Sequence, residues 1–207
     1  MKKFIMVYLA VGLICAGRSG AAVTLNFSEL PNQPVDGLSY MGITFRFTVG
    51  GSPSSDAEYN SFGPGIATFL EDPSLEGNAE GVLTLEFAPE PADELQFGVA
   101  LSTELTDESL DPGFTVELFD TNFLSLGVTP VSTSPLIEFT EGQFTYCGAP
   151  IRQAVVDFDE NSAERFAMDN VTFHPVGPSN PVPSPGALLL GSMGTVLVSW
   201  LRRNRTL

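Results

Sequence analysis

Apolar and polar residues alternate with a period of two along most of the chain. Residues 43–49 (ITFRFTV), 81–87 (GVLTLEF) and 114–118 (FTVEL) each place apolar side chains on one side and mostly polar side chains on the other. Such alternation is typical of a β-strand that is buried on one face. About ten or eleven short segments of this kind, separated by turn-forming residues, predict an antiparallel β-sandwich. The expected fold of residues 23–175 is therefore all-β, a two-sheet β-sandwich or jelly roll.

The last alternating segment, residues 165–173 (RFAMDNVTF), changes parity in its middle. Its large apolar residues occupy even positions before Asp169 and odd positions after Asn170. A β-bulge that absorbs one residue would keep both apolar sets on the same face. The alternative is a strand with mixed faces at a sheet edge. Because bulges redirect the neighbouring side chains, Asp169 is the residue of greatest interest in this segment.

Residues 1–22 predict a secretory signal peptide. Lys2 and Lys3 precede an apolar stretch from Phe4 to Ala16, which is followed by the small residues GRSGAA. A retained membrane anchor is the alternative, but its apolar core would be shorter than the roughly 20 residues that span a bilayer. The protein is therefore expected to be exported.

The other end of the chain predicts a membrane anchor. Residues 176–185 are rich in proline and form an extended linker, and residues 186–201 contain no charged side chain. The basic tail, residues 202–207, then supplies Arg202, Arg203 and Arg205. Because positive residues stay in the cytoplasm, one transmembrane helix over 186–201 would leave the preceding domain outside.

This ending resembles the PEP-CTERM sorting signal, which consists of a Val-Pro-Glu-Pro-like motif, a short span and a basic cluster. Val182, Pro183, Ser184 and Pro185 occupy the place of the motif, although Ser184 stands where the family usually has Glu. The resemblance implies processing by an exosortase, an integral-membrane transpeptidase. It also implies first an inner-membrane location, then the cell surface or an extracellular matrix rich in exopolysaccharide.

The charge of the exported part is strongly negative. All 25 acidic residues lie between residues 23 and 180, against three arginines, Arg46, Arg152 and Arg165, which gives −22. This surface would repel nucleic acids and anionic membranes, so neither is an expected partner of the domain. The acidic residues either keep the protein soluble or bind divalent cations outside the cell.

Calcium is the one cofactor that the acidic composition favours, because Ca²⁺ prefers carboxylate and carbonyl oxygens. The turn DFDEN offers Asp157 and Asp159. The segments LNFSELP, GITFRF and FAMDNVTF also resemble lectin-like carbohydrate-binding modules, some of which hold structural calcium. That resemblance implies Glu29 and Asp169 as ligands. The alternative is that these acids are solvated and bind no ion.

No catalytic motif is present. The chain has one His and two Cys, too few for a zinc site or a clear nucleophile–base pair, and a glycosidase carboxylate pair cannot be chosen among 25 acids. The leading hypothesis is a non-catalytic ectodomain that binds polysaccharide. The loop-like segment 50–64 offers Tyr59 and Phe62 as aromatic contacts. The alternative is a polysaccharide hydrolase or lyase, which would place an Arg beside a carboxylate, or two carboxylates, in a groove.

Overall fold

The computed structural model describes residues 21–102, 109–136 and 139–177. Within these ranges the chain forms β-strands and no helix, so the all-β prediction is confirmed. No helix in the described ranges has the length and apolar character needed to span a membrane. The predicted sorting motif, membrane helix and basic cluster all lie outside the described residues, as does most of the predicted signal peptide.

Thirteen strands make up the described part, and every pairing between them is antiparallel. Their bounds are β1 Val23–Leu25, β2 Gln33–Pro34, β3 Ser39–Tyr40, β4 Ile43–Val49, β5 Ser52–Pro53, β6 Glu58–Ser61, β7 Ser74–Asn78, β8 Gly81–Phe87, β9 Ala92–Ser102, β10 Leu110–Asp120, β11 Ser125–Pro135, β12 Phe139–Phe158 and β13 Arg165–Pro175.

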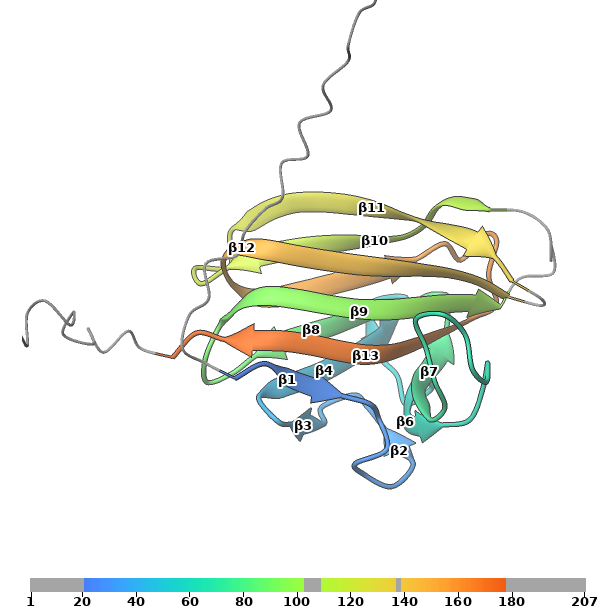
Figure 1. The fold of residues 1–207 in the computed structure, drawn as a ribbon, viewed down its shortest axis with the longest axis horizontal. Coiled ribbons are helices and arrows are strands. Elements are labelled where there is room, and N and C mark those ends of the chain that lie inside the picture. The colour runs from blue at the N-terminus through green and yellow to red at the C-terminus, as the bar shows by residue number, and fades with distance from the viewer. Residues whose placement is uncertain (1–20, 103–108, 137–138, 178–207) are drawn as a thin grey trace, which may run out of the picture. The chain divides into compact units, whose positions relative to one another are not determined.

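The long strand β12 folds this continuous sheet into two layers (Figure 1). Its first part, Phe139–Cys147, pairs with β9, and its second part, from Ile151, pairs with β8 and β10. A register shift between Cys147 and Ile151 marks the change of partner. The first layer therefore contains β7, β13, β9 and the start of β12, with β1 against β13. The second layer contains β4, β8, the end of β12, β10 and β11.

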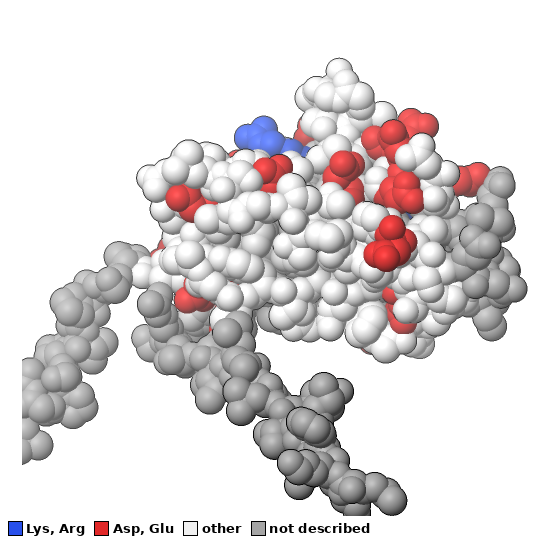
Figure 2. Space-filling view, turned by 90° about the horizontal axis from the view of Figure 1, so that it is seen from above, with Lys and Arg blue, Asp and Glu red and all other residues white. Residues whose placement is uncertain are grey.

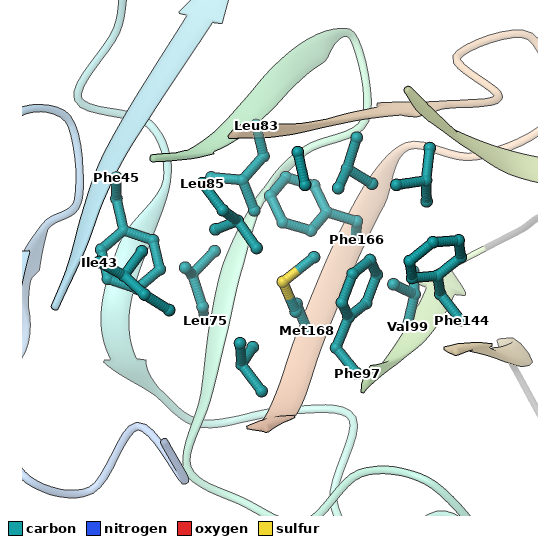
Figure 3. Close-up of a cluster of buried hydrophobic side chains, with 14 of the residues drawn as sticks. Ile43, Phe45, Leu75, Leu83, Leu85, Phe97, Val99, Phe144, Phe166 and Met168 are labelled. Carbon is teal, nitrogen blue, oxygen red and sulfur yellow. The ribbon is translucent and has the colours of Figure 1, made fainter. Parts of the chain in front are cut away.

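The alternating apolar residues fill the space between the layers, as the sequence predicts. On β4 and β8, for example, Phe45, Phe47, Leu83 and Leu85 are all fully buried. Figure 3 shows such side chains from both layers converging on one cluster. Complete burial of a Phe or Leu side chain is worth about 1.5–3 kcal/mol, so this cluster is the main source of stability.

The predicted β-bulge in β13 is confirmed. Asp169 pairs with Gly98 of β9, but Thr172, three residues later, pairs with Gln96, two residues earlier in β9. Asn170 absorbs the extra residue with a backbone φ of 55°, a left-handed conformation that Asn tolerates better than most residues. Both apolar sets of the strand therefore reach the core, and Asp169 faces away from it.

Candidate functional site

The loop between β6 and β7, residues 62–73, crosses the outer face of the first layer and is called the strap below. Small residues make room for it. A Cβ atom added to Gly98 would lie 2.4 Å from the carbonyl oxygen of Phe69. Leu70 of the strap is buried together with Ala100 of β9 and Ala167 of β13. The strap is thus packed onto the sheet and covers one half of this face.

Two buried carboxylates hold the backbone of the strap. Glu141 of β12 accepts hydrogen bonds from the amides of Thr68 and Phe69 at 2.9 and 3.2 Å, both on Oε2. Asp169 accepts one from the amide of Glu71 at 2.9 Å on Oδ2. Glu141 was not predicted from the sequence. Its partners lie more than 70 residues away along the chain, so no local pattern marks it.

The other oxygen of Asp169, Oδ1, is buried and has no hydrogen-bond partner among the described residues. Only 1% of Asp169 is exposed. Burial raises the pKa of Asp169 to about 6, against the opposing hydrogen bonds from Glu71 and Asn170, and the charges of Glu71 and Glu29 raise it further. The structure therefore buries an ionisable group whose negative charge is incompletely satisfied.

Glu29 lies within electrostatic range of Asp169 but is itself exposed. Its Oε1 accepts the Asn26 amide at 2.9 Å, and its Oε2 accepts the hydroxyl of Tyr59 at 2.6 Å. Burial alone would raise the pKa of Glu29, but these hydrogen bonds outweigh it and lower the pKa. Each oxygen of Glu29 keeps a further lone pair.

Tyr59 corrects one expectation from the sequence. Its ring is fully buried and packs edge-on against Phe27, Tyr40 and Phe45. Burial and the hydrogen bond to Glu29 raise the pKa of its hydroxyl. Tyr59 therefore anchors the N-terminal segment to the core and offers no surface on which a ligand can stack.

Asp157 and Asp159 lie apart from that pair. Together with Asp111 they line a separate pocket of about 380 Å³ beside Phe114. Asp159 uses Oδ1 to accept the amide of Asn161 at 3.2 Å. In the described ranges no group of three or more acidic, His or Cys side chains is arranged to hold a metal ion. The four predicted calcium ligands are thus divided between two places.

The half of the outer face that the strap leaves open carries a row of uncharged polar side chains. Thr24 of β1 pairs with Thr172 of β13, Thr172 with Gln96 of β9, and Gln96 with Thr145 of β12. The hydroxyls of Thr24 and Thr172 lie 2.9 Å apart, which shows that both point to the same side. These four residues, called the polar row, are exposed or half-exposed. None of the four was predicted from the sequence as a site residue.

Phe62 stands at the start of the strap with 80% of its surface exposed, as the sequence-based hypothesis requires of a stacking aromatic. The next residue, Gly63, lines a pocket of about 140 Å³ with Glu76, Ser102 and Arg165. Burial raises the pKa of Glu76, although the Ser74 hydroxyl and the nearby charge of Arg165 oppose the rise. Arg165 and Glu76 therefore share a pocket, which corresponds to one of the two arrangements expected of the enzyme alternative.

Comparisons with known proteins find solved structures with a similar fold but do not identify a family for this chain. No family model matches the chain, and no curated protein matches it in sequence. A xylan-binding domain from Paenibacillus barcinonensis has 14% identity and a TM-score of 0.38, with 79% of this chain and 100% of that one covered. A family 29 carbohydrate binding module from Piromyces equi has 12% identity and a TM-score of 0.41, with 80% and 97% covered.

A third solved structure is a xylanase fragment from Clostridium thermocellum in complex with xylohexaose, at 14% identity and a TM-score of 0.41. The match covers 77% of this chain but only 29% of that one. Identities this low leave the function of the present chain to be inferred from its own side chains.

Proposed function

We propose that the protein is a non-catalytic, polysaccharide-binding module that acts outside the cell, and that the polar row holds the glycan. The observation that carries this proposal is the row itself. Thr24, Thr172, Gln96 and Thr145 present hydroxyl and amide groups in register across four adjacent strands. Sugars are recognised by such donors and acceptors, and neighbouring strands lie about 4.8 Å apart, a spacing comparable to the length of one pyranose residue.

The charge of the molecule selects the class of glycan. The row is uncharged in a chain of net charge −16. A polyanionic glycan would be repelled by the surrounding carboxylates, whereas a neutral one would not. Phe62, on the strap, supplies an exposed aromatic ring that a sugar face can stack against. The proposed ligand is therefore an uncharged polysaccharide.

Titration of the full-length chain in mild detergent with soluble glycans tests this function. The probes are hydroxyethyl cellulose, galactomannan and starch as uncharged polymers, and alginate as a polyuronate. Because a hydrogen bond is worth about 0.5–1.5 kcal/mol, the double variant Gln96→Ala/Thr145→Ala should bind roughly tenfold more weakly. Thr84→Ala, on the outer face of the other layer, is the matched control. Binding of alginate alone, or equal binding by both variants, would contradict the proposal.

We also propose that Asp169 and Glu29 hold a structural calcium ion. The unpartnered, buried Oδ1 of Asp169 fits a cation ligand, and Glu29 lies within electrostatic range of it. When bound, calcium would neutralise the buried charge and tie the N-terminal segment to β13. Asp157 and Asp159 are not part of this proposal. Calcium should raise the melting temperature of the wild type but not of Asp169→Asn, while Asp157→Asn should respond as the wild type does. Equal melting points in calcium and in chelator would refute the idea.

The proposed location follows from the sequence resemblance. The chain is exported, anchored in the inner membrane by residues 186–201, and then transferred by an exosortase to the cell surface or matrix. The support is the order of the Val182–Pro185 motif, the uncharged stretch and the Arg202–Arg205 cluster. Cell fractionation of the native chain and of Pro183→Ala/Pro185→Ala, with and without the exosortase, tests it. If mature mass and location are the same in all four samples, the sorting proposal fails.

The non-catalytic assignment rests on the size of the pocket that Arg165 and Glu76 line together. At about 140 Å³ it is smaller than the roughly 300–1,000 Å³ of typical ligand pockets, so a glycan chain cannot pass through it. The full-length chain should therefore release no reducing ends and no unsaturated products from a glycan that it binds. Release that is lost in Glu76→Gln would favour the hydrolase or lyase alternative instead.

A further inference from the structure

Exposed apolar side chains gather at the β10–β11 hairpin. Phe123 and Leu124 in its turn are 53% and 65% exposed, and Leu126 and Val128 on β11 are 47% and 57% exposed. These four residues are called the β11 patch below. Together they form an apolar surface of the order of a few hundred Å², the size at which patches on monomers mark interaction sites.

The turn that presents Phe123 and Leu124 is well organised. The carboxylate of Asp120 accepts hydrogen bonds from the amides of Asn122 and Leu124 on Oδ1, at 2.7 and 2.9 Å. The backbone of Asp120 also exchanges two hydrogen bonds within the turn, with Phe123 and Leu124. The backbone that carries these apolar side chains is therefore ordered before any partner arrives, which reduces the entropy lost on binding.

The strand β11 also lies at an edge of the second layer. One side pairs with β10 over most of its length. On the other side only Ser134 and Pro135 pair, with the start of β12, so Ser125–Thr133 has no second strand among the described residues. An open strand edge can pair with another chain, but Pro130 lacks an amide hydrogen and interrupts the row of donors. A contact here would rest mainly on the apolar side chains.

The distribution of charged residues indicates which kind of partner can bind at the open edge of β11. The strand β11 contains no charged residue, although the chain carries 25 acidic residues and a net charge of −16. Figure 2, which looks down on the molecule as oriented in Figure 1, shows acidic groups scattered over this side with uncharged areas between them. Two copies of an acidic protein repel each other wherever carboxylates meet. The strand β11 itself brings no carboxylate to a facing copy. The carboxylate of Glu117, the β10 partner of Val128, lies on the side away from the open edge and accepts the Ser125 hydroxyl.

We propose that the β11 patch is a self-association surface that joins two copies of this chain about a two-fold axis. An edge strand placed antiparallel to its own copy is self-complementary, as a two-fold interface requires. The area buried in both copies together is below the roughly 1,200 Å² of stable complexes, so the dimer is weak and reversible. Copies anchored on one surface would still meet often enough to pair. The β11 patch does not overlap the polar row, so this inference does not depend on glycan binding.

Sedimentation of the full-length chain in mild detergent, from about 1 µM to about 1 mM, tests the proposal. Leu126→Glu/Val128→Glu places carboxylates on both sides of the axis and should raise the dissociation constant at least 100-fold. Met41→Glu changes a residue that is also 47% exposed but lies elsewhere, and it should leave the constant unchanged. Melting curves of both variants check that they are folded.

A charge-swap mixture separates this interface from pairing through other parts of the chain. Leu126→Lys/Val128→Lys should be monomeric alone, but a 1:1 mixture with the Glu variant should form dimers again. A wild-type chain that stays monomeric at about 1 mM overturns the proposal. So does a dimer that the Glu variant leaves intact, or a mixture that stays monomeric, because each would show that β11 does not join the copies.

Discussion

Replacing Asp169 by Asn tests the consequence of burying its carboxylate under the strap. In the folded protein the pKa of Asp169 is raised to about 6 by burial, whereas an unfolded chain has an Asp pKa of about 3.9. Below about pH 4 the group is protonated in both states, so its ionisation does not change the free energy of unfolding. Between about pH 4 and pH 6 the unfolded chain is ionised while the folded carboxyl stays protonated, so stability falls across this window and levels off above about pH 6. About two pKa units correspond to roughly 3 kcal/mol.

The assay is urea unfolding of wild type and Asp169→Asn at about pH 4, 5, 6 and 7, with chelator present so that no divalent ion binds. Other carboxylates, such as Glu29 with its lowered pKa, change stability in the opposite direction. The contributions of carboxylates that do not interact with Asp169 cancel in the difference between the two proteins. The Asn variant should gain roughly 3 kcal/mol relative to the wild type between about pH 4 and pH 7.

Asp157→Asn is the matched control, because Asp157 is exposed on the outer face of the other layer. This substitution removes an acidic side chain that lies away from the strap, and it sets the baseline for the comparison. If the difference for Asp169→Asn is flat over the same pH range, the carboxylate is solvated in solution, and the account of the strap and of the cation site is wrong.

Three further changes probe the strap and its surroundings. Gly98→Ala should destabilise the protein by about 1–3 kcal/mol in denaturant titrations, because the new methyl group meets the Phe69 carbonyl; an unchanged midpoint would contradict close packing. Glu141→Gln should speed hydrogen exchange of the Thr68 and Phe69 amides without changing that of the core strands, since the charged acceptor of both is lost. Tyr59→Phe should cost about 1–2 kcal/mol through the lost bond to Glu29, and a neutral result would show that this bond contributes nothing.

The strands could be predicted from the sequence because their periodicity is local. Residues 43–49 and 81–87 alternate strictly and coincide with β4 and β8. The parity change at Asp169 likewise predicted the β-bulge. Without the extra residue of the bulge, Val171 and Phe173 would point out of the core. In both cases the pattern and its structural cause lie within a few residues of each other.

The strap and its anchors could not be predicted in this way. Residues 50–64 have the composition of a loop, yet they contain the strand β6 and the fully buried Tyr59, whose partner Glu29 lies 30 residues away. Glu141 and the polar row depend equally on residues that only the fold brings together. Nothing in the local sequence distinguishes Gln96 from other outward-facing polar residues of the strands.

Hydrogen–deuterium exchange of the full-length chain, with and without the uncharged polysaccharide that binds best, tests the central claim most directly. Residues 94–98 of β9 and 143–147 of β12, which flank the polar row, should exchange more slowly with glycan bound, as should the strap. Residues 114–131 of the other layer should not change. Protection confined to that second layer, or to none of these segments at saturating glycan, would contradict the account.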